Sequence, residues 1–269
     1  MNVGVGLPNT TPGASGELML EWARRADRGP FSSLAVLDRL VYASHEPMTS
    51  LAAAAGVTER IRLATMIVIA PLRSGALLAK EAATVAALSG GRLTLGLGLG
   101  ARHDDYDAAG VDHRTRGRRF SRQLAELRDA WDADPVPELL VGGNSGPAFE
   151  RMARYGDGYA HGGGPPRAFA SAATKAAAAW RDLGRPGRPR LWGQAYFALG
   201  DEAAGAEYLR DYYAFTGPFA ETVAAANLTS ARAIRDLVRG YADEGCDELV
   251  LLPTVASLDQ LDRLAEVLA

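Results

Sequence analysis

Short apolar runs alternate with amphipathic segments along the whole chain. Apolar runs of four to nine residues between turn signals are typical of buried strands. They occupy residues 3–7, 33–37, 61–69, 92–97, 137–141, 158–161, 191–199 and 248–252. Helical periodicity follows each run, over residues 17–28, 49–55, 76–88, 114–131, 147–155, 166–183, 201–240 (interrupted at Gly217-Pro218) and 257–268.

Strands that alternate with helices indicate a parallel sheet, and eight such units indicate a closed barrel. We therefore expect an α/β fold, a (β/α)8 TIM barrel, with a doubly wound open sheet as the alternative. No linker long enough to separate domains is visible, so we expect a single domain over residues 1–269.

The composition narrows the possible partners and the compartment. With a net charge of −3, the chain has no strong excess of positive charge that would attract nucleic acid or an anionic membrane. No apolar stretch approaches the roughly 20 residues of a membrane span, and the first residues lack a signal-peptide pattern. Cys246 is the only cysteine, which fits a reducing compartment. We expect a soluble, cytoplasmic protein that binds no nucleic acid and no membrane.

Chemistry in such a barrel is expected just past the carboxyl ends of the strands. Asp38-Arg39 follows the second expected strand. The pair forms either a salt bridge at the rim or a cation that meets an anionic ring or substrate. His161 ends the sixth expected strand, where it is either a proton carrier or a histidine satisfied by neighbouring backbone.

Two glycine-rich segments are candidates for ligand contact. Gly142, Gly143, Asn144 and Ser145 open an expected helix, where free N–H groups suit a phosphate. The alternative is that Asn144 or Ser145 is an ordinary N-cap. The segment from Gly96 through Gly98 to Gly100 precedes a polar loop, so it is not a dinucleotide fingerprint. Its glycines either fit the packing of a strand or give clearance to a flat ligand.

The polar segment around residues 102–106 is expected to be a solvated loop. It holds His103, Asp104 and Asp105, and His113 follows. Neither H-x-x-x-H nor H-E-x-x-H spacing occurs there, so we expect no metal site.

Four segments, in order, resemble the bacterial luciferase-like monooxygenase superfamily. The first is R-I-R-L-A-T at 60–65, continuing to Pro71-Leu72-Arg73. The second runs from A-K-E-A-A-T at 79–84 to L-S-G-G-R-L at 88–93 and Gly96-Leu97-Gly98. The third is G-G-N-S at 142–145 with A-R-Y-G-D-G at 153–158, and the fourth is E-G-C-D-E-L at 244–249.

The resemblance implies a barrel that binds FMN or the 8-hydroxy-5-deazaflavin coenzyme at the carboxyl ends of the strands. Gly142, Gly143, Asn144 and Ser145 would take the phosphate, and Gly98 and Gly100 would give clearance to the ring. A non-proline cis peptide near Met66-Ile67 would lie behind the ring. The resemblance also implies a homodimer, packed through early helices, and NAD(P)H as an electron donor.

We therefore expect an oxidoreductase or monooxygenase acting on a small organic substrate. Arg39 and His161 would touch the ring or substrate, and Asp38 would orient Arg39. Two features depart from the family. Arg39 stands where many members have histidine and cannot act as a base, and the segment between Trp131 and Pro137 is shorter than the usual insertion.

These departures motivate two alternatives. One is a non-catalytic flavin-binding protein of the same fold. The other is a flavin-independent barrel enzyme that binds a phosphate ester at the Gly142 turn.

Overall fold

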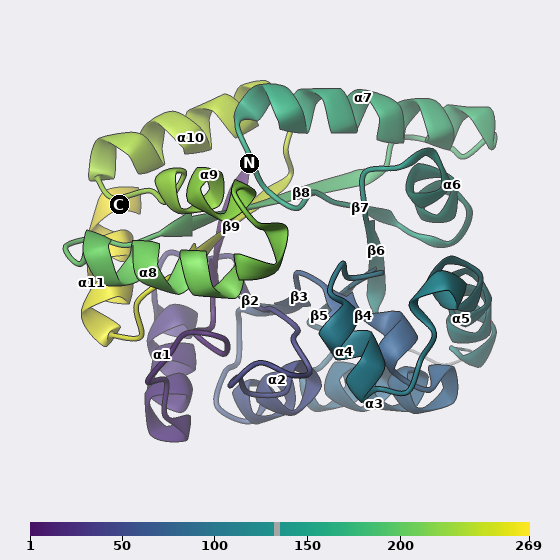
Figure 1. Ribbon diagram of the computed structural model, residues 1–269, viewed down its shortest axis with the longest axis horizontal. Helices are drawn as coiled ribbons and strands as arrows, with labels where there is room; N and C mark the ends of the chain where they lie inside the picture. The colour runs from purple at the N-terminus through teal and green to yellow at the C-terminus, as the bar shows by residue number, and fades with distance from the viewer. Residues whose placement is uncertain (132–134) are drawn as a thin grey trace.

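The computed structural model describes residues 1–131 and 135–269. Its strands all run parallel around a central barrel (Figure 1). They are β1 (Asn2–Gly6), β2 (Ser33–Val36), β3 (Arg62–Thr65), β4 (Val68–Ile69), β5 (Leu93–Gly98), β6 (Glu138–Gly142), β7 (Gly158–Ala160), β8 (Arg190–Phe197) and β9 (Glu248–Pro253).

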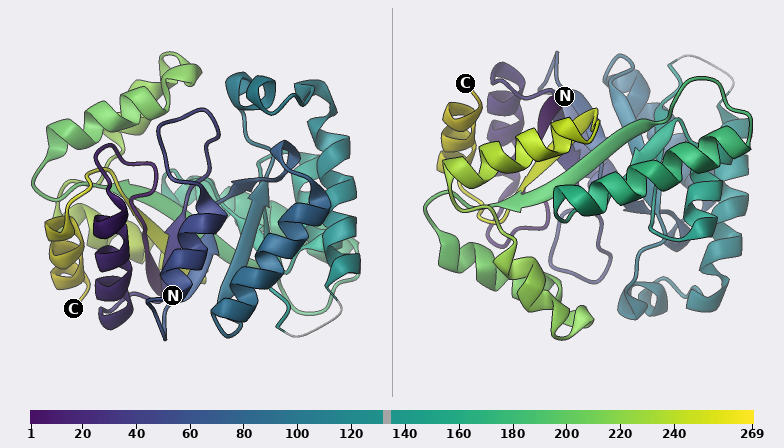
Figure 2. Two further views of the ribbon diagram at one scale, coloured as in Figure 1. Left: turned by 90° about the horizontal axis from the view of Figure 1, so that it is seen from below. Right: turned by 90° about the horizontal axis from the view of Figure 1, so that it is seen from above.

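The helices surround this barrel (Figures 1 and 2). They are α1 (Gly16–Arg28), α2 (Pro47–Ala55), α3 (Gly75–Leu88), α4 (His103–Ala108), α5 (Arg116–Ala130), α6 (Gly146–Tyr155), α7 (Pro166–Asp182), α8 (Glu202–Tyr212), α9 (Phe219–Ala225), α10 (Ala231–Asp243) and α11 (Leu258–Leu268). Three short 3-10 turns are η1 (Ala70–Leu72), η2 (His113–Thr115) and η3 (Ala214–Thr216). In the described part of the chain, none of the helices combines the length and apolar character that crossing a bilayer requires.

The sheet closes on itself. β1 pairs with both β2 and β9, while β3 and β4 both pair with β5 and together form one interrupted strand of the barrel. The nine segments therefore fill eight strand positions. This confirms the expected (β/α)8 barrel and excludes the open doubly wound sheet.

Three expected elements differ from the structure. The helical region expected over 201–240, with an interruption at Gly217-Pro218, is divided a second time, because α9 ends at Ala225 and α10 begins at Ala231. The strand expected over 61–69 is split into β3 and β4, and the peptide bond between Met66 and Ile67 is cis, as the family resemblance implied. The polar segment expected to be a solvated loop forms helix α4 instead. The expected short segment between Trp131 and Pro137 includes residues 132–134, which lie outside the described residues.

Two apolar layers hold the barrel together. The outer layer packs the strands against the helices, with Trp22, Phe120 and Phe169 among its fully buried rings. The inner layer fills the barrel with side chains such as Ala35, Met66 and Trp192. Strands buried on both faces explain why their sequences are nearly continuous apolar runs. The inner layer also includes Tyr208, Leu209 and Tyr212 of α8, so this helix packs over the interior.

Candidate active site

Asp38, directly after β2, is buried and paired with Arg73 rather than with Arg39. Its Oδ2 accepts from Arg73 Nη1 at 2.6 Å and from the Ile69 N–H at 2.8 Å, and its Oδ1 accepts from Arg73 Nη2 at 3.1 Å. Burial raises the pKa of the Asp38 carboxyl, and Arg73 offsets part of that rise. The expectation that Asp38 orients Arg39 is wrong, because both carboxylate oxygens are engaged by the β4–η1 segment.

Arg39 is held by the two aspartates of α4. Its Nε donates to Asp105 Oδ2 and its Nη2 donates to Asp104 Oδ2, both at 3.0 Å. The side chain of Asp105 has no exposed surface, and its Oδ1 also accepts the N–H groups of Leu40 and Val41. Arg39 therefore forms salt bridges at the rim, but with Asp104 and Asp105 and not with Asp38 as the sequence alternative had it. The α4 aspartates were missed as a site because they were expected to be solvated.

Aromatic rings enclose two guanidinium groups at this rim. The Arg39 Cζ lies 5.1 Å from the Tyr42 ring centroid and 5.7 Å from that of Tyr212. The Arg102 Cζ lies 4.4 Å from the Tyr212 centroid and 4.3 Å from the Phe215 centroid. Cations over ring faces at such distances are attracted electrostatically. The tyrosines of α8 belong to no recognisable sequence motif, so this contact could not be predicted from the sequence.

Hydrogen bonds hold helix α8 across one side of the barrel mouth. The hydroxyl groups of Tyr208 and Thr10 form a hydrogen bond of 2.7 Å, and the Tyr42 hydroxyl donates to Asp211 Oδ2 at 2.6 Å. Arg102 donates to the Tyr212 carbonyl oxygen. Both α8 and α4 stand at the same end of the barrel (Figure 2, left). Burial raises the pKa of Tyr208 and Tyr212 well above the usual range, so their phenols stay protonated.

The side of the mouth formed by β5, β6 and β7 carries small residues. Gly98, Gly142 and Ala160 end these strands. A Cβ added at Gly98 would lie 2.9 Å from Ile67 Cδ1, and one added at Gly142 would lie 3.4 Å from Ile67 Cγ2. Ile67 therefore spreads over the glycines of both strands and packs with Met66 against the inner apolar layer.

The clearance expected at Gly98 and Gly100 is filled by protein. At Gly100, where φ is +66°, a Cβ would lie 2.8 Å from Ile69 Cγ2. The two glycines make room for the isoleucines on either side of Val68, not directly for a flat ring. Any ring at this floor would meet the partly exposed Ile67.

The turn after β6 leaves the first turn of α6 open to solvent. Ser145 is the N-cap residue, with φ −118° and ψ 159°, yet its side chain makes no capping hydrogen bond. Residues 143–147 are exposed. Gly143 has φ +128°, and a Cβ there would lie 2.8 Å from the Ala148 Cβ. This geometry requires glycine at position 143. Pro147 has no N–H group, and the Ala148 N–H donates to the Ser145 carbonyl oxygen at 2.9 Å. The N–H groups that could donate to an anion are therefore those of the turn and of Gly146.

His161 lies on the helix-facing side of β7. Its ring centroid is 5.6 Å from that of Phe169 on α7 and 6.5 Å from that of Tyr241 on α10. Alternation along the strand puts it on the side of Tyr159, opposite the inward Ala160. Its ring nitrogens have no hydrogen-bond partner among the described residues. The structure therefore does not bring His161 together with Arg39: Arg39 lies at the rim with the α4 aspartates, and His161 lies against α7 and α10.

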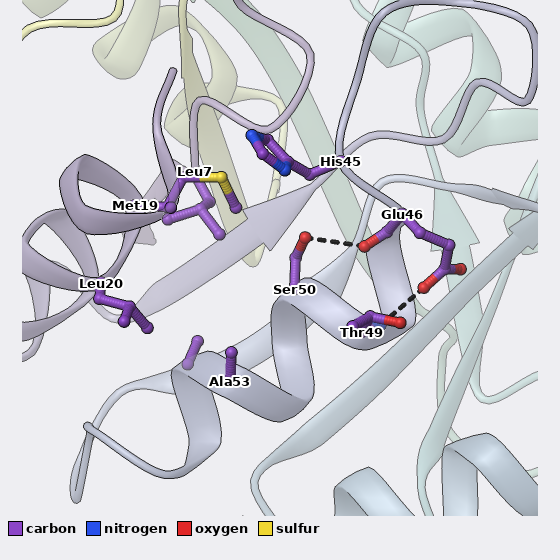
Figure 3. Close-up of a pocket in the computed structure, with 10 residues that line it drawn as sticks. Leu7, Met19, Leu20, His45, Glu46, Thr49, Ser50 and Ala53 are labelled. Atoms are coloured by element: carbon purple, nitrogen blue, oxygen red, sulfur yellow. Dashed lines mark hydrogen bonds between the residues drawn. The ribbon is translucent and has the colours of Figure 1, made fainter.

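Two further hollows lie near the barrel. One of about 370 Å³ is lined by Thr11, Tyr208, Asp211 and Thr254 beside α8. Another of about 300 Å³ lies between α1 and α2, where Leu7, Met19 and Leu20 face Ala53 (Figure 3). Among residues 1–131 and 135–269, no three His, Cys, Asp or Glu side chains gather in a way that could hold a metal ion.

The sequence profile of one protein family covers most of the chain. The profile described as luciferase-like monooxygenase matches residues 1–245. The chain belongs to the luciferase-like monooxygenase family. The motifs quoted from the sequence and the cis peptide between Met66 and Ile67 agree with this assignment.

Curated relatives match parts of the chain. Over 143 residues it is 34% identical to an uncharacterised protein of Mycobacterium tuberculosis, covering 45% of this chain and 49% of that protein. Over 121 residues it is 29% identical to the oxygenase component of flavin-dependent trigonelline monooxygenase from Acinetobacter baylyi, covering 43% and 34%. The chain thus matches about half of the former relative's length and about a third of the latter's.

Solved structures of the same fold match nearly the whole chain. An F420-dependent secondary alcohol dehydrogenase in complex with an F420-acetone adduct superposes with a TM-score of 0.81 at 17% identity, over 99% of this chain and 97% of that one. The oxygenating constituent of 3,6-diketocamphane monooxygenase of Pseudomonas putida, in complex with FMN, gives 0.75 at 16% identity, over 100% and 97%. At these identities the likeness supports the fold alone.

Proposed function

We propose that the protein is an oxidoreductase that binds FMN or the 8-hydroxy-5-deazaflavin coenzyme and acts on a small organic substrate. The observation that carries the proposal is the exposed N-terminus of α6, which lacks a side-chain cap and follows a glycine turn at the barrel mouth. Membership of the luciferase-like monooxygenase family supports it.

The residues at the mouth fit such a cofactor. Gly143, Asn144 and Ser145 offer exposed donors beside a positive helix dipole, which suits a phosphate. Inside the barrel, Trp192 Nε1 and Gln194 Oε1 are buried polar atoms without partners in the described part of the chain. Such atoms need a hydrogen-bond partner, which a bound ligand or an ordered water would supply.

When bound, the cofactor would supply hydride transfer or oxygen activation. The chain's own residues would orient it and limit its contact with water. Ile67 would support one face of the ring, and α8 would shield the side of the mouth formed by β8, β9 and β1. Arg39 would act as a positioning residue, because its charge is already matched by Asp104 and Asp105.

Substituting the N-cap serine tests the proposal. Aspartate is as good an N-cap as serine, so Ser145→Asp keeps α6 folded while it places a negative charge where the phosphate would bind. We expect titration with FMN and with the deazaflavin coenzyme to give a Kd at least about tenfold weaker, the usual scale for a lost charge-assisted contact. Absorbance and fluorescence distinguish the two cofactors.

Ser257→Asp is the matched control. Ser257 is the N-cap of α11, and it also makes no side-chain capping hydrogen bond. We expect this variant to keep the affinity of the unaltered protein. Equal weakening in both variants, or no binding of either cofactor to the unaltered protein, would refute the proposal.

We also propose NAD(P)H as the electron donor and a homodimer that packs through α1 and α2. The apolar hollow between these helices supports the second point (Figure 3). Sedimentation velocity gives the assembly mass, and anaerobic mixing with NADPH or NADH reports reduction of the bound cofactor.

A second candidate is a protein that binds the cofactor without turnover. One observation favours it: Arg39 is neutralised by two aspartates, and His161 faces the helices. Cofactor binding at micromolar levels, without NAD(P)H-linked reduction and without oxygen consumption with aldehydes, ketones or enones, would favour this candidate over the enzyme.

A further inference from the structure

The beginning of α5 carries an unusual concentration of positive charge. Residues 114–122 contain five arginines, Arg114, Arg116, Arg118, Arg119 and Arg122, in a chain whose net charge is −3. The first turn of α5 holds no acidic residue, and the side chain of Thr115 does not cap it. The Thr115 hydroxyl donates to the Asp112 carbonyl oxygen at 2.7 Å instead.

This arrangement opposes the ordinary electrostatics of a helix. The N-terminal end of a helix is positive, so cations there are unfavourable. Like charges four residues apart on a helix, such as Arg118 and Arg122, repel each other. An anion bound among these side chains would interact favourably both with the helix dipole and with the arginines.

The arginines line a hollow. Thr115, Arg118, Arg119 and Arg122 share one side of α5 and line an open surface hollow of about 470 Å³. Carboxylates neutralise little of the charge: Arg122 pairs with the exposed Glu126 at 3.2 Å, and Arg118 forms no ion pair within the described part of the chain. Arg119 donates Nη2 to the Arg73 carbonyl oxygen at 3.0 Å, while its Nε is buried with no partner among the described residues.

The hollow is separate from the exposed N-terminus of α6. Helix α6 meets α5 through Arg151, which donates to the Gly117 carbonyl oxygen and the Ser121 hydroxyl. Successive residues of a helix are about 100° apart, so Arg118 and Arg122 project away from the side that meets α6. Arg119 instead reaches toward η1 through Arg73.

We propose that the hollow on α5 is a binding site for a phosphate-bearing small molecule. Guanidinium groups match phosphate oxygens in bidentate geometry and stay charged at every physiological pH. Arg118 and Arg122 bring two exposed guanidinium groups to the hollow and Arg119 adds a third positive charge beside it, which suits a phosphate monoester or a diphosphate better than a singly charged carboxylate. The proposal does not depend on the cofactor at the barrel mouth.

Calorimetry with inorganic pyrophosphate tests the site. We expect one pyrophosphate bound at α5 in the unaltered protein. In Arg118→Gln/Arg122→Gln the affinity should fall about tenfold or more, because two charge-assisted contacts are lost. Ser145→Asp should leave this binding event unchanged, which separates it from a phosphate at α6.

Arg235→Gln/Arg239→Gln is the matched control. These two arginines are also exposed and four residues apart on one helix, α10, so the change in net charge is the same. We expect the control to bind pyrophosphate like the unaltered protein. Equal weakening in both double variants, or no pyrophosphate binding at all, would overturn the proposal, as would loss of binding in Ser145→Asp.

A comparison of NADPH with NADH distinguishes the sources of the phosphate. The two differ only in the 2′-phosphate. Tighter binding of NADPH that disappears in Arg118→Gln/Arg122→Gln supports a nucleotide phosphate in the hollow. Equal binding of NADPH and NADH, with pyrophosphate still dependent on Arg118 and Arg122, supports a site for other phosphate compounds.

Discussion

Arg39 Nε and Asp105 Oδ2 lie 3.0 Å apart and join two segments that are 66 residues apart in the chain. Asp105 also accepts the N–H groups of Leu40 and Val41, so one buried carboxylate fixes the whole turn after β2. Asp104 binds the same guanidinium from a side chain that is 51% exposed. The two neighbouring aspartates therefore differ in burial and share one partner.

Asp105→Asn should destabilise the protein far more than Asp104→Asn. Asp105→Asn removes the buried carboxylate and leaves Arg39 with only the exposed Asp104, and breaking a buried ion pair costs about 3–5 kcal/mol. The exposed pair with Asp104 contributes at most about 1 kcal/mol. Urea unfolding followed by circular dichroism measures both free energies. Equal losses in the two variants would mean that burial does not determine the contribution of this ion pair.

The fold could be predicted because buried parallel strands have a strong one-dimensional signal. All eight strand positions were expected within a few residues, and the Gly217-Pro218 interruption after α8 was visible in the sequence. The same reasoning failed for α4, because His103-Asp104-Asp105 is polar and typical of a solvated loop. Its buried partner, Arg39, lies too far away in the chain for a local pattern to reveal.

The candidate site was only partly predictable for a related reason. Strand alternation puts Tyr159 and His161 on one side of β7 and Ala160 on the other, yet a three-residue strand does not reveal which side faces inward. The Gly142 turn was found because a glycine turn before a helix is a local signal. The tyrosines of α8 were missed, since contact with Arg39 depends on how that helix crosses the mouth.

Gly98→Ala should destabilise the barrel through a clash with Ile67, and Ile67→Val should relieve it. The added Cβ would meet Ile67 Cδ1 at 2.9 Å, and overpacking of this kind costs about 1–3 kcal/mol. Valine at 67 removes that Cδ1 atom. We expect Gly98→Ala/Ile67→Val to recover most of the loss in thermal unfolding.

Gly96→Ala is the control for the recovery of stability by Ile67→Val. Its Cβ would lie 2.2 Å from the Thr65 carbonyl oxygen, which is backbone and cannot be trimmed. We expect Ile67→Val to leave the Gly96→Ala loss unchanged. If Gly98→Ala alone unfolds at the same temperature as the unaltered protein, then Ile67 does not require a glycine at position 98.

Cys246 should resist alkylation in the native protein. Burial raises the pKa of its thiol to about 12, and only the thiolate reacts. At pH 8 roughly one molecule in ten thousand then carries the thiolate. We expect no iodoacetamide adduct by mass spectrometry over an hour, and complete modification after unfolding in guanidinium chloride. An adduct on the native protein within minutes would contradict the buried position before β9.

His161 should make the protein less stable as the pH falls below about 6.5. Burial lowers the pKa of its imidazole from the usual 6.5, against an opposing backbone contact from Gly163. The unfolded chain therefore binds the proton more readily than the folded one, so stability is complete above the unfolded pKa and declines below it. His161→Phe keeps a ring beside Phe169 and removes the titrating group. In urea unfolding from pH 5 to 8, its free energy of unfolding should depend less on pH.

His45→Phe is the control, because the His45 ring is solvent-exposed, and it should keep the pH dependence of the unaltered protein. An unchanged slope in His161→Phe would show that His161 gains its proton equally well in both states.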